Sequence, residues 1–395
     1  MKILIITARI PFPPFRGDKL RIFNVIKSLA KRNEVMVLSF LKDSSDKKFL
    51  DEFRLLGFNI EVIYLSKVRS MVNLLRSLFN SDPLQVSYYH SRQMHNKVSE
   101  LTSKINFDVI YFHLFTVAQY QRSVADRNVL TVLDFTDATS LYLKRYLEFL
   151  NHPLEKLYFG FERKRIFKYE TIAKHFNAVF VCSKVDQKYL SDRKIHPNIK
   201  LFTNGIDSEI YKYESAQYEK FRIIFTGNMP YFPNKDAVLY FANEIFPIVL
   251  KKEPRAKFFI VGQNPSQEIL NLRSNSIIVT GLVADIKKEY LKSEVNVAPV
   301  RFGAGTPNKI SEALALGIPT VATSLTISGF PDEIKKFIYT ADTPEEFTAK
   351  IINVFNDGSI RSEFMKIASK AVVELFNWTK VVNDLEDYLL ELKKI

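Results

Sequence analysis

The sequence predicts an α/β fold of two domains, each built around a parallel β-sheet. Short apolar, β-branched runs alternate with amphipathic helical segments along the whole chain, which is the pattern of βαβ units. This alternation starts twice, and each start is a strand followed closely by a glycine, Gly17 in the first half and Gly227 in the second. A chain of 395 residues is also too long for one compact core and fits two domains of ordinary size.

Short runs rich in Val, Ile and Phe are expected to form the strands. They begin in the first half at Lys2, Glu34, Ile60, Asp108, Val129, Ala178 and Ile199, and in the second at Phe221, Ala256, Ser276, Glu294, Pro319 and Phe337. The polar, tyrosine-rich segment 208–220 separates the two series. We therefore expect one domain over residues 1–207, another over 208–377, and a C-terminal helix over 378–395, where apolar residues recur at helical spacing.

Composition narrows the classes of protein to consider. Apolar residues make up 47% of the chain and charged residues 25%, as in globular proteins. The single cysteine, Cys182, cannot build a disulfide framework or a cysteine zinc site. The N-terminus lacks the long apolar core of a signal peptide, and no stretch reaches the ~20 apolar residues of a membrane span. We therefore expect a soluble, cytoplasmic protein.

The two strand–glycine turns are candidate anion sites. Asp18 is placed to cap the helix after Gly17, and Asn234 to cap the helix after Gly227. A glycine there lets the backbone approach a ligand, and the N–H groups of a helix N-terminus favour an anion. The alternative is a plain strand-to-helix turn. The sequence contains no G-x-G-x-x-G, which argues against a simple NAD fingerprint.

The segment between residues 295 and 325 is a more specific candidate for a ligand site. A strand ends at Pro299, and Arg301 and a loop with Gly303 and Gly305 follow. A helix then opens near Asn308 and closes before Gly317, a natural C′ residue. A helix N-terminus supplies only about half a positive charge, so Arg301 and Lys309 are candidates to balance a nucleoside diphosphate, and Glu312 could accept hydrogen bonds from its ribose. The alternative is a capped surface helix with a solvated lysine and glutamate.

Several segments together resemble one known family. They are "RIPFPPFRGDKLR", "DVIYFH", "LDFTDATS", "FVCSKVDQKYL", "TNGID", "FTGNMPYFPNKDAV", "FIVGQNPS", "VTGLVADI" and "GTPNKISEALALGIPTVAT". Over nearly the whole chain the sequence resembles the retaining family 4 glycosyltransferases of the GT-B fold, in particular the subgroup found with exopolysaccharide export systems. The resemblance implies two Rossmann-like domains that face each other across a cleft. It gives the acceptor to domain 1–207 and the nucleotide sugar to domain 208–377, with helix 378–395 packing back on the first domain.

The resemblance also assigns roles to residues. It implies catalytic roles for His113, at the end of a strand, and for Gly17, which faces the donor. Acceptor binding is assigned to Arg16, Asp18, Arg21 and Asp137. Donor binding is assigned to Gly227, Asn228, Lys235, Arg301, Gly305, Thr306, Asn308, Lys309 and Glu312.

The sequence departs from the family pattern in two places. Glu312 matches the second glutamate of an E-x7-E element, but Ala304 stands where the first glutamate is expected. The family's Arg/Lys pair after the strand at Phe225 is reduced to Lys235, and we hypothesise that Arg301 compensates. The first departure leaves the identity and orientation of the transferred sugar open.

The implied reaction moves a sugar from a nucleoside diphosphate to a lipid-linked or polysaccharide acceptor in cell-surface glycan synthesis. In the family mechanism the configuration is retained, and the departing diphosphate takes the acceptor's proton. The sequence contains no D-x-D, so we expect no metal ion and no further cofactor. Two alternatives stay open. One is a nucleotide-sugar epimerase of GT-B fold, and the other is a catalytically silent glycan- or lipid-binding module of that fold.

The net charge of +13 raises a separate question about partners. No helix-turn-helix, RNP or zinc motif is present, so nucleic acid is not expected. Residues 66–97 hold five Lys/Arg and one acid, and Met71, Leu74, Leu75 and Leu78 form the apolar side of a basic amphipathic helix. Such a helix can dock reversibly on an anionic membrane, at its inner face, and with residues 145–170 it could rim a lipid-linked acceptor. The alternative is a helix that packs on its own domain with a solvated basic face.

Overall fold

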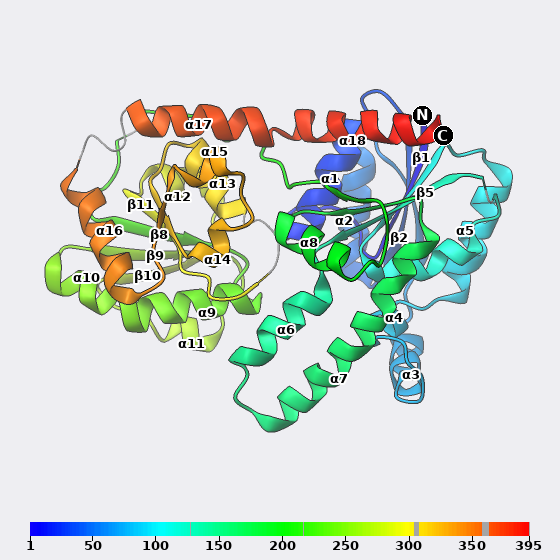
Figure 1. The fold of residues 1–395 in the computed structure, drawn as a ribbon, viewed down its shortest axis with the longest axis horizontal. Helices are drawn as coiled ribbons and strands as arrows, with labels where there is room; N and C mark the ends of the chain where they lie inside the picture. The colour runs from blue at the N-terminus through cyan, green and yellow to red at the C-terminus, as the bar shows by residue number, and fades with distance from the viewer. Residues whose placement is uncertain (127, 216, 304–307, 358–362, 395) are drawn as a thin grey trace. The chain divides into compact units, whose positions relative to one another are not determined.

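The computed structural model describes the chain except residues 127, 216, 304–307, 358–362 and 395 (Figure 1). The chain divides into two compact units. Unit 1 comprises Met1–Thr203 and Val382–Ile395, and unit 2 comprises Asn204–Val381. The limits lie a few residues from 207 and 377 because Ile206 exchanges backbone hydrogen bonds with Phe376 and Trp378, which joins the segment after Thr203 to unit 2.

Unit 1 is built on a seven-stranded parallel sheet in the order β3-β2-β1-β4-β5-β6-β7. All seven strands predicted in the first half are confirmed. Their bounds are β1 Lys2–Thr7, β2 Glu34–Leu41, β3 Asn59–Tyr64, β4 Val109–His113, β5 Leu130–Thr136, β6 Ala178–Val181 and β7 Ile199–Leu201.

Helices connect the strands of unit 1 (Figure 1). The α-helices are α1 Gly17–Leu29, α2 Ser44–Leu55, α3 Lys67–Ser77, α4 Leu84–Tyr88, α5 Arg92–Lys104, α6 Thr139–Phe149, α7 Pro153–Tyr169 and α8 Lys184–Asp192. Two 3₁₀ segments follow β4 and α7, namely η1 Phe115–Ser123 and η2 Glu170–His175. The C-terminal helix α18, Trp378–Lys393, begins in unit 2 and continues into unit 1.

Side chains of α18 bind unit 1 directly. Glu386 is 8% exposed and accepts hydrogen bonds from Arg32 Nη2 at 2.5 Å and Asn33 Nδ2 at 2.8 Å. Tyr388 Oη donates to Asn198 Oδ1 at 2.6 Å. The helix therefore belongs to the first unit over most of its length.

Unit 2 is built on a six-stranded parallel sheet in the order β10-β9-β8-β11-β12-β13. The six strands predicted in the second half are confirmed, as β8 Arg222–Thr226, β9 Lys257–Val261, β10 Ile277–Gly281, β11 Val295–Ala298, β12 Thr320–Ala322 and β13 Ile338–Thr340. The helices are α9 Phe232–Tyr240, the π-helical η3 Phe241–Ile245, α10 Phe246–Lys252, α11 Gln267–Leu270, α12 Ile286–Leu291, α13 Asn308–Ala315, α14 Ser324–Ile327, α15 Asp332–Lys335, α16 Pro344–Asn356 and α17 Glu363–Phe376.

The two sheets share one topology, which locates the functional edge of each. Counted from its own first strand, each sheet runs 3-2-1-4-5-6, with one strand more in unit 1. This is the doubly wound order of Rossmann-like domains, and ligands in such sheets bind outside the carboxyl ends of the strands where the order reverses. That switch point lies between β1 and β4 in unit 1, and between β8 and β11 in unit 2.

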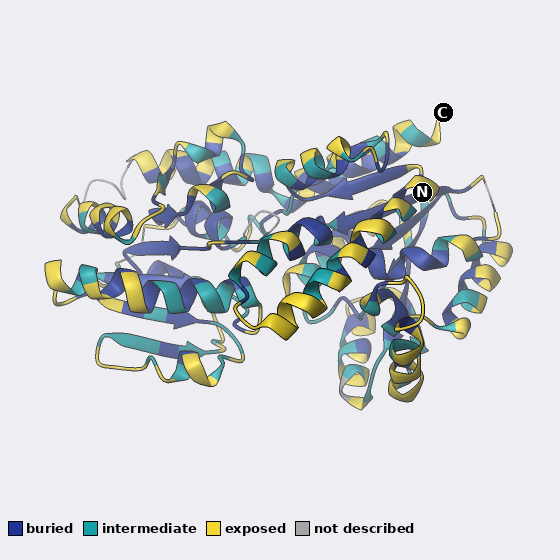
Figure 2. Cartoon of the chain, turned by 60° about the horizontal axis from the view of Figure 1, so that its bottom comes forward, coloured by how far each residue is buried: buried dark blue, intermediate teal, exposed yellow. Residues whose placement is uncertain are grey.

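Burial explains why the strands read as continuous apolar runs. The central strands are dark blue in Figure 2, because helices cover both faces of the sheets, whereas the edge strands β3 and β10 are partly exposed. In β1, residues Ile3 to Ile6 are all 0% exposed. Burying one such side chain stabilises the fold by about 1.5–3 kcal/mol, so a run of four fixes this strand at the centre of its sheet.

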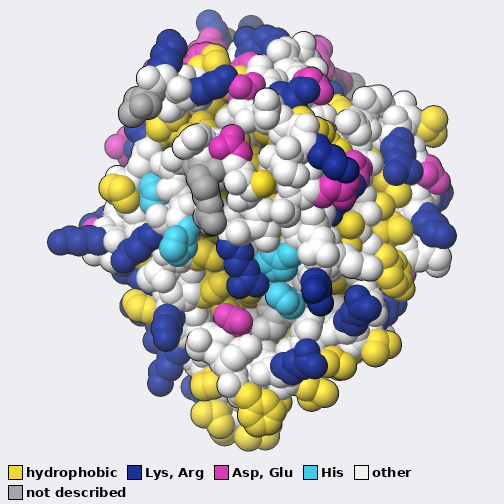
Figure 3. Space-filling model, turned by 90° about the vertical axis from the view of Figure 1, so that its right-hand side faces the viewer, with side chains coloured by type: hydrophobic (Ala, Val, Ile, Leu, Met, Phe, Trp, Pro, Cys, Tyr) yellow, Lys and Arg dark blue, Asp and Glu magenta, His cyan; other side chains and the backbone are white. Residues whose placement is uncertain are grey.

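The surface carries the excess of basic residues. Lys and Arg side chains are spread over the face shown in Figure 3, and hydrophobic side chains gather at its lower edge. Among the helices that the structure describes, none has the length and apolar character needed to cross a membrane.

Candidate functional site

His113 occupies the switch point of unit 1. It is the last residue of β4 and lies in register with Thr7, the last residue of β1. Its side chain is 2% exposed, and within the described part of the chain its Nε2 has no hydrogen-bond partner. Burial lowers the pKa of His113 to about 4, although the Asp134 and Asp18 carboxylates oppose the shift. The imidazole is therefore neutral at pH 7, and its Nε2 is a buried polar atom that no described residue satisfies.

Gly17 is the first residue of helix α1. A Cβ built on Gly17 would meet nothing within 4 Å, so no packing in the described structure demands a glycine there. The expectation that Asp18 caps the helix is wrong. Arg16 is the N-cap residue and makes no capping bond through its side chain. The Asp18 carboxylate instead accepts hydrogen bonds from Arg9 at 2.6 Å and Arg16 at 3.2 Å, because these cations flank it on both sides.

Arg21 is part of a buried ion pair. It is 1% exposed, and its guanidinium binds Asp134 through Nε at 2.7 Å and Nη2 at 3.2 Å. Tyr111 Oη also donates to Asp134, at 2.6 Å. Burial alone would raise the pKa of Asp134, but the guanidinium holds it below its usual value. In this structure Arg21 has almost no surface open to an acceptor, and its contacts give it the structural role of neutralising a buried carboxylate.

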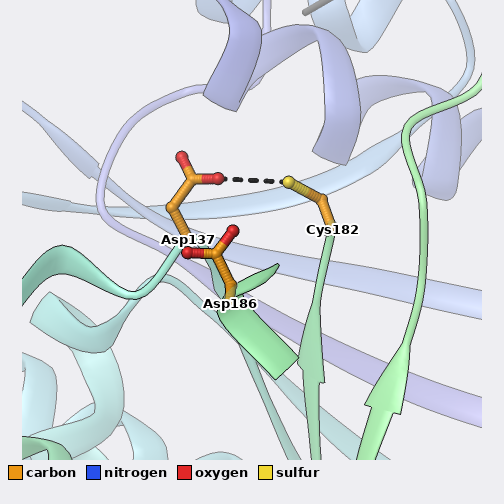
Figure 4. A group of neighbouring side chains, drawn as sticks. All are labelled: Asp137, Cys182 and Asp186. Carbon is orange, nitrogen blue, oxygen red and sulfur yellow. Dashed lines mark hydrogen bonds between the residues drawn. The ribbon is translucent and has the colours of Figure 1, made fainter. Parts of the chain in front are cut away.

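Asp137 lies just beyond β5 in a small polar cluster with Cys182 and Asp186 (Figure 4). Cys182 Sγ donates to Asp137 Oδ1 at 3.1 Å, and burial keeps the thiol protonated by raising its pKa. Burial and then the neighbouring Asp186 raise the pKa of Asp137 to about 7. Asp186 accepts hydrogen bonds from Ala138 N and Ser183 Oγ, so it holds the start of α8. Asp137, half-buried, is the member of this cluster that a ligand can reach.

Lys309 is the central cation at the switch point of unit 2. It is the second residue of α13, which follows β11, and is 9% exposed. Its Nζ donates to Asn234 Oδ1 at 2.7 Å and lies 3.7 Å from the centre of the Phe225 ring. Throughout the described residues it forms no ion pair. Burial without a counter-ion lowers the pKa of Lys309 to about 7, even though Glu312 opposes the shift.

Glu312 lies one turn further along α13. Its Oε2 accepts a hydrogen bond from Tyr290 Oη at 3.2 Å. The same hydroxyl is 2.5 Å from Thr226 Oγ1, at the end of β8. Burial raises the pKa of Glu312 to about 7, and Tyr290 and Lys309 only partly offset this. Glu312 as a residue is half-buried.

The turn after β8 supports the lysine. Helix α9 begins at Phe232 with Tyr231 as its N-cap residue, so the expected capping role of Asn234 is wrong. Asn234 lies inside the first turn, where its Nδ2 donates to Asn228 O at 2.9 Å and its Oδ1 faces Lys309. A Cβ on Gly227 would lie 2.7 Å from Asn234 Nδ2, so here packing does demand a glycine.

The backbone N–H of Gly227 is already used, since it donates to Val261 O at 3.0 Å. It is therefore not available to an anion, contrary to the expectation for this turn. The Asn228 side chain accepts a hydrogen bond from Gln263 Nε2 at 3.1 Å and stays partly exposed.

The other residues predicted to bind the nucleotide sugar differ in their contacts. Arg301 binds Asp236 through Nε at 3.0 Å and Nη2 at 2.5 Å, and Lys235 pairs with Glu268 at 2.8 Å, so both cations already have an anionic partner. Asn308 is the first residue of α13 that the structure describes. Gly305 and Thr306 lie outside the described residues. So does Ala304, which stands in place of the first glutamate of the E-x7-E element. The expected C′ residue Gly317 is confirmed by its φ of +77°.

Sequence reasoning missed the partners of both key residues in unit 2. Asn234 was interpreted as a cap, yet it is the acceptor that holds Lys309. Tyr290, on α12, was not singled out, yet it is 0% exposed and bonds Glu312. The only signal for Asn234 was its place after a strand–glycine turn, and nothing in the sequence around Tyr290 indicated the contact.

The chain is similar to known proteins in sequence and in fold. Residues 220–357, which include Lys309 and Glu312, match the family described as "Glycosyl transferases group 1". Over 97% of its length the chain is 21% identical to 98% of a Klebsiella pneumoniae protein named "Uncharacterized 44.6 kDa protein in cps region".

Two solved structures show the same fold. Anabaena HepE in complex with UDP superposes with a TM-score of 0.69 at 16% identity, covering 99% of this chain and 100% of that one. A mutant of S. aureus TarM, in complex with Fondaparinux, alpha-GlcNAc-glycerol and UDP, has a TM-score of 0.70 at 12% identity and covers both chains fully. The fold is thus that of GT-B proteins, and the matched domain supports a glycosyltransferase.

Proposed function

We propose that this chain transfers a sugar from a nucleoside diphosphate donor to an acceptor of cell-surface glycan synthesis, with retention of configuration and without a metal ion. Unit 2 binds the nucleotide and unit 1 handles the sugar and the acceptor, which we take to be lipid-linked or a polysaccharide. The donor is a metabolite of the cytoplasm, so we place the reaction there.

The observation that carries the proposal is the unpaired lysine at the switch point of unit 2. An isolated ammonium group is costly to bury, so proteins pair it or neutralise it. Lys309 is 9% exposed, has a lowered pKa and forms no ion pair within the described residues. A diphosphate beside Nζ supplies the missing anion. Glu312, one turn on, then accepts hydrogen bonds from the ribose hydroxyls.

Neighbouring proteins support the choice of donor. HepE structures hold UDP, and one of them is a complex with UDP-glucose. The relative encoded in a cps region supports a role in making a surface glycan. The basic residues and helix termini at the unit 2 edge are the groups that we propose in place of a metal ion.

In the proposed reaction the anomeric carbon breaks its bond to the diphosphate oxygen and bonds the acceptor oxygen on the same face. The departing diphosphate receives the acceptor's proton. His113 is neutral because its pKa is about 4, so it can share a hydrogen bond with a hydroxyl of the transferred sugar without adding charge. The main catalytic contribution is stabilisation of the leaving diphosphate, in which we assign Lys309 the largest part.

Calorimetric titration of the purified protein with UDP, GDP, CDP and ADP tests this function. We expect one nucleotide to bind with micromolar affinity, equally with and without EDTA. Glu312→Ala should abolish the binding, whereas Glu333→Ala, at an exposed glutamate of the same unit, should leave it unchanged.

The other possible results of this titration would each support a different function. If none of the four nucleotides binds, the silent binding module becomes the better description. If the protein converts a nucleotide sugar to free nucleotide with no acceptor present, the epimerase becomes the better description. Loss of binding in EDTA would overturn the metal-independent part of the proposal alone.

A further inference from the structure

Helix α3 of unit 1 has its apolar side outward. Its inward side has two buried serines, Ser70 at 1% and Ser77 at 0% exposed, and one half-buried apolar residue, Leu74. Asn73 on the same side donates to His90 O at 2.9 Å. The outward positions and the turn that follows are apolar and largely exposed: Val68 74%, Met71 57%, Val72 40%, Leu75 62%, Leu78 60% and Phe79 92%. A helix that only packs on its own domain is expected to show the opposite pattern. The basic residues Lys67, Arg69 and Arg76 are exposed as well, so both the apolar and the basic side chains of this helix face solvent.

Helix α7 carries a second exposed apolar stripe. Leu154 is 70% exposed, Leu157 72%, Tyr158 51% and Phe161 55%. These residues follow helical spacing, and they occupy the first half of the helix. Both α3 and α7 extend on the same side of the sheet of unit 1 in Figure 1, and hydrophobic side chains gather at the corresponding lower edge in Figure 3.

The two helices are fastened together by buried polar contacts. Arg165 of α7 is 6% exposed and donates through Nη2 to the carbonyl oxygens of Ser77 at 2.7 Å and Asn80 at 3.0 Å. Glu162, 5% exposed, accepts a hydrogen bond from Leu84 N at 2.7 Å. Exposed apolar side chains on scattered elements need no explanation, but two such helices that hydrogen bonds connect through the end of α3 and the turn after it can form one surface.

Cations surround this surface. The exposed charged residues of α3, α7 and the turn after α3 are six cations and two acids, namely Lys67, Arg69, Arg76, Lys156, Lys164, Lys168, Asp82 and Glu155. Helix α3 has three cations and no acid. A second copy of the chain would bring the same positive charge to the contact. An anionic bilayer offers both negative headgroups for the cations and a hydrocarbon layer for the apolar side chains.

We propose that the α3–α7 surface docks unit 1 on the face of an anionic membrane, with the outward side chains of α3 entering the headgroup boundary. The docking does not depend on donor chemistry. It brings the chain to the layer where a lipid-linked acceptor would be found.

Flotation of the full chain with lipid vesicles tests the proposal. The native protein should float with phosphatidylcholine vesicles that contain phosphatidylglycerol, and much less with phosphatidylcholine alone. Leu75→Glu combined with Phe79→Glu should weaken binding by more than about tenfold, because two large apolar side chains are lost from the contact. Arg69→Gln combined with Arg76→Gln should weaken it about fivefold per charge and reduce the preference for phosphatidylglycerol.

Leu55→Glu is the matched control, because Leu55 is 86% exposed on α2 and lies outside the surface. It should leave flotation unchanged. Thermal unfolding and nucleotide titration of every variant separate loss of docking from loss of fold or donor site. The proposal is overturned if the native chain does not float with phosphatidylglycerol vesicles. It is equally overturned if sedimentation shows a dimer that Leu75→Glu and Phe79→Glu dissolve while flotation persists.

Discussion

The two switch points have the same strand topology but differ in which charged groups have a partner of opposite charge. In unit 1 the arginine next to the site, Arg21, is fully paired with Asp134, and Asp18 is paired with Arg9 and Arg16. The neutral imidazole of His113 there keeps an Nε2 that bonds to none of the residues the structure describes. In unit 2 the corresponding group is a lysine, Lys309, which bonds Asn234 and forms no ion pair with any described residue.

Under the proposed function, this difference would assign the diphosphate to the edge of unit 2 and the transferred sugar to the edge of unit 1. An unpaired buried cation favours an anion such as a diphosphate, whereas a neutral ring nitrogen in a charge-balanced setting suits an uncharged sugar hydroxyl. If the comparison holds, variants at the unit 2 edge change nucleotide affinity. Variants at the unit 1 edge change turnover instead.

His113→Ala should produce the largest effect. Removing a hydrogen bond made to the reacting sugar in the transition state typically costs about 10²–10³-fold in kcat. The dissociation constant of the nucleoside diphosphate should stay at its native value, since the diphosphate carries no sugar. Steady-state kinetics with the nucleotide sugar, combined with calorimetry, measures both.

His175→Ala is the control for this variant, because His175 is an exposed histidine of the same unit. It should change neither quantity. An affinity loss in His113→Ala as large as its loss in kcat would break the division of labour between the two edges.

Lys309→Gln should weaken nucleotide binding by about 10- to 100-fold. A hydrogen bond to a charged group contributes about 1.5–3 kcal/mol, and the amide keeps a donor but not the charge. Calorimetric titration measures the loss. Lys251→Gln, at an exposed lysine of the same unit, should have no effect. Retention of native affinity in Lys309→Gln would move the diphosphate site away from α13.

A pair of glycine substitutions sharpens the comparison further. Gly227→Ala should lower the free energy of unfolding by about 1–3 kcal/mol, because its Cβ would press on Asn234 at 2.7 Å. Gly17→Ala should leave unfolding unchanged, because its Cβ meets nothing within 4 Å, and should lower activity only if a substrate approaches there. Denaturant unfolding of both variants measures the free energy of unfolding, and transfer rates measure their activity. Equal destabilisation by the two would contradict the open space at Gly17.

The fold could be predicted largely from the sequence, and the reason is burial. Strands such as β1 are covered on both faces, so they appear as unbroken apolar runs that periodicity detects. The strand order could not be predicted, because it depends on which runs pair across long stretches of chain. Helix starts were misjudged at Asp18 and Asn234 for a related reason. Each has a cap-forming side chain, but a tertiary partner, Arg9 or Lys309, binds it instead.

The places of the candidate residues in the fold were predictable, but the side chains that contact them were not. The spacing around Lys309 and Glu312 placed both on the helix after β11, which the structure has at α13. That Arg21 is neutralised by Asp134 could not be predicted, since the two lie 113 residues apart in the chain. The same limit hid Asn234 and Tyr290, whose importance comes from tertiary contacts with α13.

The smallest expected effect is the uptake of about one proton when the nucleotide binds at pH 8. Burial holds the pKa of Lys309 at about 7, so at pH 8 the free protein has a mostly neutral lysine. A diphosphate favours the charged form and raises this pKa, so binding at pH 8 should take up close to one proton. Affinity should then fall as the pH rises above 7, by at most about tenfold per pH unit. Calorimetry in two buffers of different ionisation enthalpy measures the proton count.

At pH 6 the sign should reverse. Burial raises the pKa of Glu312 to about 7, so the free carboxyl group is mostly protonated there. A ribose hydroxyl that donates to the carboxylate favours the ionised form and drives proton release. The terminal phosphate also titrates near about pH 6, so pH 8 is the cleaner condition for Lys309. Lys309→Gln should remove the uptake at pH 8 and keep the release at pH 6. No uptake by the native protein at pH 8 would mean that Lys309 is already charged before the nucleotide arrives, and the contrast between the two edges would then lose its basis.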